Sequence, residues 1–584
     1  MAAITSPQTS AMNGDQVKQR WVSQAILLLA LLLAFANIVQ NPLFESPDEL
    51  LHYRFVRYLL DEGQLPIQPA DDTLTQYHQP PLYYLGGAVL VAGFDDPQTD
   101  PLVNPFWLSY NPGDVHRDNK AQFLPQQPLM GLFSGTALVV RLLRLWSLLL
   151  LAGILWALKR MAMELWPQRP GQQALFLAVA ALNPMLLYIG SSVNNDNLVV
   201  LLGTLLLVVL IRSLRTRFTA LTAVVVGLLW GAAALSKING LLLLAPVTVA
   251  MLWSAYSDRR WSRWLVLGVA TLGVGLLLSG WWFARNVSLY GELFGVERML
   301  DIWGERTAGE WDVATLMATL QYAQETFWAR FGYGQIVLPD VLTYPFVALT
   351  LLGIGGLLMR LREMTRAARE RQAGAWLTLA VAAVVFLTAF AYFMWRNPSG
   401  ANGRYIYPAI GALAAFVASG VARLPLQRVV RPATILLMSG IAIFSLAWLV
   451  PWTYAAPAHN GTGAGSQTSP GLTQLFWEPG MQLRSAALHS WDVSGVENPE
   501  AQLYACWLAL RALQENYVFY VHVLDRDLEV IGRRDTHTGL GNYPTSLWQS
   551  NTAFCETYRV PLDTSHLEGP HVADVTIGFY ETQS

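Results

Sequence analysis

Long runs of apolar residues recur through the first three quarters of this chain and constrain its fold more than any other feature. We predict about eleven of them, each of about 16 to 21 residues, the length that an α-helix needs to cross the hydrocarbon core of a bilayer. The sequence is 53% hydrophobic and only 13% charged, unlike an average soluble domain. A polytopic α-helical membrane protein is therefore predicted. The predicted spans begin near Val22, Thr136, Gln173, Leu198, Thr219, Gly240, Trp264, Pro345, Ala375, Tyr405 and Pro432.

The distribution of positive charge predicts how these spans are oriented. Lysine and arginine residues concentrate in alternate loops, and such loops normally stay in the cytoplasm. We therefore predict that the chain crosses the plasma (inner) membrane and that its N-terminal tail 1–21 is cytoplasmic. The long loops 40–135 and 283–344 then lie outside. Because the predicted number of spans is odd, the C-terminal region is extracytoplasmic as well.

The last part of the chain has a different pattern from the transmembrane domain, which we assign to residues 22–454. A segment rich in Gly, Ser, Thr and Pro, 455–472, is predicted to be a linker. In 473–584, stretches such as YVFYVHVLD alternate apolar and polar residues with the period of a half-buried strand. This predicts an extracytoplasmic all-β sandwich domain. It holds both cysteines, Cys506 and Cys555, which an extracytoplasmic location would allow to form a disulfide.

Charged residues gather in the stretch SPDELLH, which begins at Ser46 directly after the first span. Ser46, Pro47 and Glu49 match a capping box with proline at the first helical position, so an ordinary helix start explains them. Asp48, Glu49 and His52 are also spaced to share one helical face where the protein meets water. The residues alone leave a helix start and a catalytic cluster open.

Three cations on the predicted outer surface are candidates for binding an anion. Lys237 ends the fifth span, where an ionisable residue is a functional candidate by default, although snorkelling to the interface would also explain it. Arg404 follows the small residues GANG, which leave room for a phosphate, and Arg285 ends the seventh span. Asp196, in SSVNNDN, is a second acidic candidate and equally a cap for the fourth span.

Six segments, taken in order along the chain, resemble the GT-C-type polytopic membrane glycosyltransferases. The resemblance is greatest to bacterial members related to protein mannosyltransferases and lipid A aminoarabinose transferase. The C-terminal region is similar to β-sandwich domains appended to such enzymes. The six segments are SPDELLH, YHQPPLYY, LNPMLLYIGSSVNNDNL, GLLWGAAALSKINGLLLLAP, WWFARNVSLYGELFG and GANGRYIYPAI.

This resemblance implies an inverting hexosyl- or pentosyltransferase of cell-envelope glycan assembly. It would move a sugar from a polyprenyl-phosphate donor to an extracytoplasmic glycan, lipid or protein. Asp48 would be the catalytic base, with Glu49 as the alternative base or as the residue that orients Asp48.

His52 and His78 are candidates for orienting the base or for ligating a metal, although a structural hydrogen bond would also explain a histidine in such a loop. We expect Lys237 and Arg404 to bind the donor phosphate, with Arg285 as a third candidate. The residues expected to position acceptor or substrate are His78, Tyr83, Asn195, Asp196 and Tyr405.

A divalent cation, Mg or Mn, is a further expectation from the resemblance, with Asp48 and Asp196 as candidate ligands. No clear pair of acids is present, which puts metal dependence in doubt. Two other function classes stay open: a non-catalytic membrane scaffold with the same fold, and a transporter of lipid-linked glycans, which calls for repeats or broken helices. The net charge of −2 argues against nucleic acid as a partner.

Overall fold

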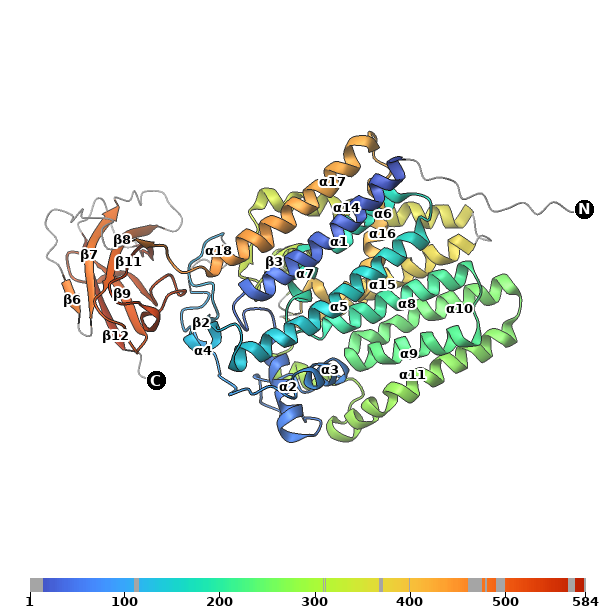
Figure 1. Cartoon of the computed structure of the whole chain (residues 1–584), viewed down its shortest axis with the longest axis horizontal. Helices are drawn as coiled ribbons and strands as arrows, with labels where there is room; N and C mark the ends of the chain where they lie inside the picture. Colours follow the sequence, from blue (N-terminus) through green and yellow to red (C-terminus); the bar gives the residue numbers. More distant parts are fainter. Residues whose placement is uncertain are drawn as a thin grey trace, which may run out of the picture.

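The structure is a computed structural model of the whole chain, in which a helical bundle is followed by a β domain (Figure 1). The first residues of α1 (Gly14–Gln40) and the β domain lie at opposite ends of the bundle (Figure 1). The structure describes residues 14–109, 115–307, 309, 311–366, 371–398, 400–460, 475–477, 480–489, 499–563, 565 and 573–581.

Helices occupy the predicted spans, so the prediction of a polytopic helical membrane protein is confirmed. Within the described ranges, 9 helices are long and apolar enough to cross a membrane. A pair of helices bent by 60°, α6 (Pro170–Ala181) and α7 (Pro184–Gly190), would make a tenth span. The apolar helix α9 (Ala220–Ser236), of 17 residues, accounts for the remaining prediction. The other helices of the bundle are α5 (Gly135–Leu165), α8 (Asp196–Arg215), α10 (Leu244–Asp258), α11 (Trp261–Tyr290), α14 (Asp340–Arg366), α15 (Arg371–Arg396), α16 (Ile410–Val421), α17 (Gln427–Ile443) and α18 (Val450–Tyr454).

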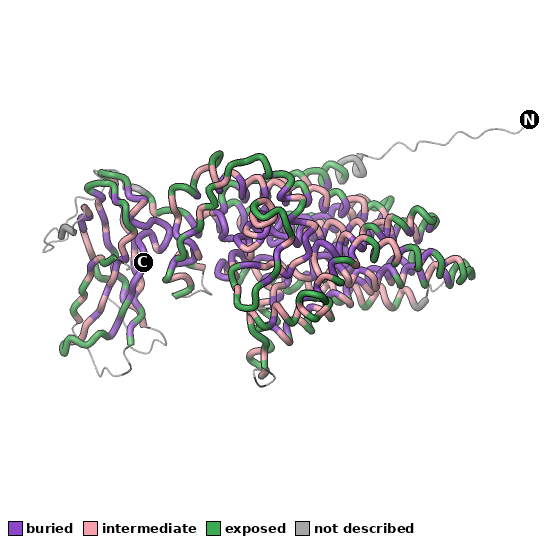
Figure 2. The backbone as a smooth tube through the Cα atoms, turned by 90° about the horizontal axis from the view of Figure 1, so that it is seen from below, coloured by how far each residue is buried: buried purple, intermediate pink, exposed green. Residues whose placement is uncertain are grey.

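Glycines allow some of these helices to pack backbone against backbone. A Cβ atom on Gly356 of α14 would come within 2.0 Å of the Phe416 carbonyl oxygen, and one on Gly420 of α16 equally close to the Leu352 carbonyl oxygen. Small residues serve this purpose in membranes, where lipid is as apolar as the helix surface. Figure 2 shows buried residues through the middle of the bundle, whereas α11 exposes large side chains such as Leu277, at 85%.

Two long connections at the β-domain end build the frame for the candidate site. The first, between α1 and α5, contains α2 (Glu49–Glu62), α3 (Leu82–Val91), the antiparallel strands β1 (Leu102–Val103) and β2 (Phe123–Leu124), and α4 (Gln127–Met130). The second, between α11 and α14, contains α12 (Val296–Trp303), α13 (Val313–Trp328) and the strand pair β3 (Arg330–Phe331) and β4 (Ile336–Val337). Short 3₁₀ segments, η1 (Ile238–Leu243) and η3 (Gly403–Ala409), precede α10 and α16.

The C-terminal domain consists of two antiparallel sheets, which confirms the predicted β-sandwich. Its core holds Trp507, Phe519 and Tyr558, and Cys506 and Cys555 form a disulfide between paired strands. One sheet has the order β10-β9-β12 and the other β5-β11-β8-β7-β6. The strand bounds are β5 (His459–Asn460), β6 (Leu475–Trp477), β7 (Met481–His489), β8 (Glu500–Ala509), β9 (Tyr517–Leu524), β10 (Val530–Thr536), β11 (Ala553–Pro561) and β12 (Asp574–Glu581). Strand β5 falls within the predicted linker, whose remainder from 461 onward lies outside the described residues.

A buried ion pair attaches the β domain to the first of the two connections. The Arg534 guanidinium of β10 donates to both carboxylate oxygens of Asp118, at 2.7 and 2.5 Å, and its side chain is 0% exposed. The neighbouring Asn119 donates from Nδ2 to Thr536 Oγ1 at 3.0 Å. Asn542 donates to the Thr453 carbonyl oxygen at the end of α18, at 2.8 Å. The domain is therefore docked on the bundle through specific polar contacts.

Replacing Asp118 tests this docking. Asp118→Asn leaves the Arg534 guanidinium buried without a counter-charge, and removing one partner of a buried pair costs about 3 to 5 kcal/mol. We expect a lower unfolding temperature of the full chain and faster proteolytic release of the β domain. The exposed Asp574→Asn on β12 is the matched control. Identical proteolysis of the two variants would contradict the assigned role.

Candidate active site

The chain turns sharply between α1 and α2, and this turn sets the direction of the Asp48 side chain. Helix α2 begins at Glu49, and Asp48 is its N-cap in the left-handed conformation, with φ 63° and no capping hydrogen bond from its side chain. The predicted capping box is therefore wrong. Ser46 Oγ instead accepts a hydrogen bond from Asn41 Nδ2 at 2.9 Å. Positive φ is unfavourable for a residue other than glycine, so contacts around Asp48 must stabilise it.

Glu49 is held by Arg144 of α5 in a fully buried ion pair. Arg144 Nε and Nη2 donate to the two carboxylate oxygens of Glu49 at 2.8 and 2.6 Å. The backbone N–H groups of Phe44 and Val193 donate to the same oxygens at 2.9 and 3.0 Å. Arg144 uses its other N–H groups on three backbone carbonyls at the end of α1 and just beyond it. Of the two roles predicted for Glu49, this geometry favours orienting Asp48 over acting as a base.

Asp48 forms an ion pair with Arg404 of η3, which lies 356 positions later in the sequence. The Arg404 side chain is 2% exposed, whereas that of Asp48 keeps 25% of its surface open. Arg404 Nε lies 3.9 Å from Asp196 Oδ2, and Lys237 Nζ lies 2.5 Å from Asp196 Oδ1. Two carboxylates and two cations thus alternate in one place. We call Asp48, Arg404, Asp196 and Lys237 the charge cluster.

Both cations of the charge cluster also face the ring of Tyr405. The ring centroid lies 4.9 Å from Lys237 Nζ and 5.4 Å from the Arg404 guanidinium carbon. Nη1 and Nε of Arg404 are buried and have no hydrogen-bond acceptor within the described part of the chain. Unfilled donors on a buried cation are costly, and an anion bound beside Arg404 would fill them.

Electrostatics keep Asp48 ionised and His52 neutral. Burial by itself would raise the pKa of Asp48, but Arg404 and Lys237 lower it, and the net pKa lies below the ordinary value. Burial lowers the pKa of His52 to about 3, with Asp48 opposing and Lys237 and Arg404 reinforcing the shift. His52 Nδ1 lies 2.8 Å from the Tyr84 hydroxyl oxygen of α3. At neutral pH His52 is a hydrogen-bonding partner next to the base candidate, not a charge.

Residues of both long connections and of the start of α8 form another side of the candidate site. Asn195 Nδ2 is 3.2 Å from both Gln79 Oε1 and the Ser236 carbonyl oxygen, so it links the start of α8 to the segment before α3 and to the end of α9. His78 packs against Trp303 of α12, with ring centroids 5.6 Å apart. Burial lowers the pKa of His78 to about 4, and Lys237 contributes in the same direction.

Arg285 and Tyr83, both predicted site residues, are bonded to residues outside the charge cluster. Arg285 Nη2 donates to the carbonyl oxygens of Pro66 and Leu65, at 2.7 and 3.3 Å. The Tyr83 hydroxyl lies 2.8 Å from Ser147 Oγ and accepts from the Asn194 backbone at 3.0 Å. These contacts fasten loops to helices. A phosphate-binding role for Arg285 and a substrate-positioning role for Tyr83 stay predictions.

Sequence reasoning missed Arg144 and gave Tyr84 no role. A signal for Arg144 was present, because it is one of two arginines, with Arg141, early in the second predicted span, and the rule that singled out Lys237 applies to it equally. Tyr333, between β3 and β4, was also missed; it hydrogen-bonds to the Asp48 backbone. No local pattern marks a tyrosine in such a loop as a neighbour of Asp48.

The charge cluster does not fit a divalent metal ion. Asp48 and Asp196 are each already neutralised by a cation, and Arg404 and Lys237 would repel a second positive charge at the same place. Across the described ranges no group of three His, Cys, Asp or Glu residues has the arrangement to hold a metal.

Comparison with known proteins finds similarity of structure only. No protein-family model matches the chain, and no curated protein matches it by sequence. The crystal structure of ArnT from Cupriavidus metallidurans bound to undecaprenyl phosphate gives a TM-score of 0.45 at 15% identity, covering 74% of this chain and 77% of that one. The oligosaccharyltransferase of Archaeoglobus fulgidus gives 0.43 at 14%, covering 73% of this chain and 52% of that one.

The arabinofuranosyltransferase AftD from Mycobacteria gives a TM-score of 0.38 at 18% identity, covering 76% of this chain and 28% of that one. All these TM-scores lie below 0.5.

Glu45 lies in the turn before Asp48 and connects this turn to the segment on which the β domain docks. It is buried and accepts the backbone N–H groups of Phe123 and Gln122 at 2.8 and 3.1 Å. The same short segment carries Asp118, which pairs with Arg534 of the β domain. Burial raises the pKa of Glu45 to about 7, although the two backbone hydrogen bonds oppose the shift.

This raised pKa predicts a pH dependence of stability. Between pH 4.5 and about 7 the folded chain holds a proton on Glu45 that the unfolded chain has lost. The stabilising contribution is therefore complete below about pH 4.5 and falls as pH rises through 7, by at most about 3 kcal/mol. Glu45→Gln should flatten this part of the profile in thermal unfolding from pH 5 to 8. The exposed Glu62→Gln should not, and equal profiles for both variants would refute the assignment.

Proposed function

We propose that this chain is a GT-C-type glycosyltransferase that moves a sugar from a polyprenyl-phosphate donor to a hydroxyl group of an extracytoplasmic acceptor. The observation that carries the proposal is the charge cluster. In it a partly exposed carboxylate, Asp48, adjoins Arg404 and Lys237, and Arg404 has unfilled donors. Glycosyl transfer needs a group that takes the acceptor proton and cations that stabilise the departing phosphate.

Arg404 is suited to contact base and donor together. One of its nitrogens, Nη2, binds Asp48, while Nη1 and Nε are open for phosphate oxygens. A guanidinium group presents its donors in a rigid fork, so the phosphate would be fixed in orientation relative to the carboxylate. Lys237 adds a point charge on the same side, at the cost of its bond to Asp196.

In the proposed step the acceptor oxygen attacks the anomeric carbon as the bond from that carbon to the phosphate oxygen breaks. Asp48 takes the hydroxyl proton, and polyprenyl phosphate leaves with its charge opposed by Arg404 and Lys237. Because the pKa of Asp48 is held low, the proton moves late, when the sugar already carries positive charge. Attack opposite the leaving phosphate inverts the anomeric centre.

The remaining predicted residues take supporting roles in this proposal. The hydrogen bond between His52 and Tyr84 links α2 to α3 next to Asp48. Tyr405 lies against both cations, and Asn195 and His78 form the wall where an acceptor would enter. We propose a plasma (inner) membrane location with the N-terminus cytoplasmic and with the charge cluster and β domain outside. The acceptor is an envelope glycan, lipid or protein.

Substitution of Asp48 is the direct test. Asp48→Asn keeps the size of the side chain and removes its proton-accepting charge, so transfer should fall by about 10²- to 10⁴-fold while the donor still binds. The measurement is sugar transfer from radiolabelled polyprenyl-phosphate hexoses and pentoses, with donor binding measured in parallel. A wild-type chain that neither binds nor transfers any donor would overturn the proposal in favour of a scaffold or transporter.

Substitution of the adjacent Glu49 separates chemistry from folding. Glu49→Gln leaves Arg144 with a buried, unbalanced charge, which should cost about 3 to 5 kcal/mol of stability. The variant should lose thermal stability, donor binding and transfer together. Asp48→Asn should lose transfer with a much smaller loss of stability, because Asp48 is 25% exposed and Asp196 still lies 3.9 Å from Arg404. If Glu49→Gln stays stable and loses only transfer, Glu49 is the base and the assignment of Asp48 fails.

A further inference from the structure

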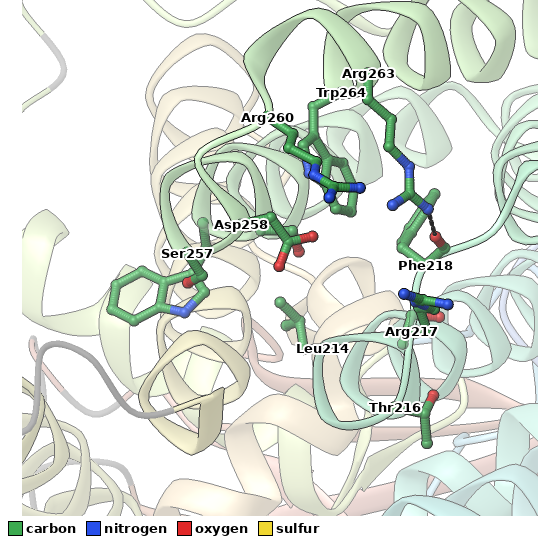
Figure 3. A pocket seen from close by; sticks show the side chains of 12 residues that line it. Leu214, Thr216, Arg217, Phe218, Ser257, Asp258, Arg260, Arg263 and Trp264 are labelled. Carbon is green, nitrogen blue, oxygen red and sulfur yellow. Dashed lines mark hydrogen bonds between the residues drawn. The ribbon is translucent and has the colours of Figure 1, made fainter.

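A polar cavity of about 260 Å³ lies at the end of the bundle opposite the charge cluster (Figure 3). Helix α8 connects the two places: it begins with Asp196 of the charge cluster, and its last turn lines the cavity. At 1.5 Å per residue its 20 residues put about 30 Å between them. The ends of α8 and α10 and the start of α11 form the cavity wall.

Arginines line this cavity without protein partners for most of their donors. The guanidinium groups of Arg217 and Arg260 have no hydrogen bond or ion pair with any residue that the structure describes, and both reach its rim (Figure 3). Arg263 donates one hydrogen bond, to the Phe218 carbonyl oxygen at 2.8 Å. Asp258 is the single carboxylate among the lining residues. The lining therefore has a net positive charge.

Further donors at the cavity lack acceptors among the described residues. Helix α11 starts at Trp261 with Arg260 as N-cap, and no side chain caps its first N–H groups, so the positive end of a 30-residue helix is open there. Trp264 also lines the cavity; it is 5% exposed, and its buried indole N–H has no acceptor in the described part of the chain. An anion with several oxygens would accept hydrogen bonds from the guanidinium groups, from the first N–H groups of α11 and from the indole N–H.

The preference of arginine for the cytoplasmic side of a membrane does not by itself explain this arrangement. Arg360 and Arg423, at the ends of α14 and α16, are paired with Glu363. The side chains of the cavity arginines form no ion pair with the residues that the structure describes, and they are grouped around unfilled donors. On α11, directly beside the cavity, Trp261, Leu265 and Val266 are 57%, 70% and 68% exposed. This apolar surface suits the chains of a lipid whose headgroup enters the cavity.

We propose that the cavity binds a phosphate group, either in the headgroup of an anionic phospholipid or in a small phosphate-bearing solute. The proposal is independent of glycosyl transfer, because no residue of the charge cluster takes part. Phosphate oxygens would accept from Arg217, Arg260 and the start of α11. The volume exceeds what one phosphate needs, so a headgroup with further hydroxyls would fit, next to the side chains of Ser254 and Ser257.

Arginine and aspartate variants of the full-length chain test the site with opposite signs. Arg217→Ala/Arg260→Ala should weaken binding by about 100-fold, since each charge-assisted hydrogen bond contributes roughly a tenfold factor. Asp258→Asn removes the one repulsive charge and should tighten binding by about twofold to fivefold. The matched control, Arg362→Ala/Arg428→Ala, removes the same charge from α14 and α17, outside the cavity.

The probes are phosphatidylglycerol and inorganic phosphate. Native mass spectrometry of protein from phosphatidylglycerol or phosphatidylcholine nanodiscs counts retained lipid, and calorimetry in phosphatidylcholine nanodiscs measures phosphate binding. Selective retention of phosphatidylglycerol, lost in the cavity variant and kept in the control, assigns the site to a lipid. Phosphate binding with the same dependence assigns it to a solute. If neither probe distinguishes the cavity variant from the control, or if Asp258→Asn weakens binding, the proposal is overturned.

Discussion

The buried ion pair between Glu49 and Arg144 is the interaction on which the position of Asp48 depends. Because neither charge can reach water, each must keep its partner, and this condition fixes α5 against the start of α2. Arg144 also donates to the carbonyls at the end of α1, so three helices meet at one guanidinium group. Asp48, one residue earlier, takes a left-handed conformation that it would not adopt in isolation. A structural ion pair thus helps to fix the direction of Asp48, the carboxylate that we propose as the base.

The neighbouring carboxylates Asp48 and Glu49 differ in the number of hydrogen-bond donors around them and in their access to solvent. Glu49 is saturated by four donors and has no access to solvent, whereas Asp48 has one cationic partner and an open side. Arg404 differs from Arg144 in the same way, since two of its nitrogens have no acceptor among the described residues. A saturated pair stabilises the fold, and an unsaturated pair leaves hydrogen-bonding capacity for a ligand. This contrast, more than residue type, is the reason for proposing the charge cluster as the reactive part of the molecule.

The spans and the β-sandwich could be predicted because their patterns are local: hydrophobic length decides a span, and alternation decides a strand. The capping box failed because Glu49 is taken by a residue 95 positions away, and no local pattern reports such a partner. Asp48, Asp196, Lys237 and Arg404 each stood out as a polar residue at a membrane surface. The ion pairs among these residues could not be predicted, because partners such as Asp48 and Arg404 are 356 positions apart in the sequence. Sequence therefore predicted the members of the charge cluster but not its geometry, nor Arg144 behind it.

The β domain is part of the frame of the site and not an appendage on a linker. Its Arg534 pairs with Asp118, and the backbone a few residues further along donates to Glu45, which stands three residues before Asp48. Undocking the domain would leave Asp118 and Arg534 without their partners and remove the support of the segment that binds Glu45. The cost of exposing or unpairing these groups opposes such a movement. A ligand that shifted the β domain would therefore act on the turn that carries Asp48, through a path of directly bonded residues.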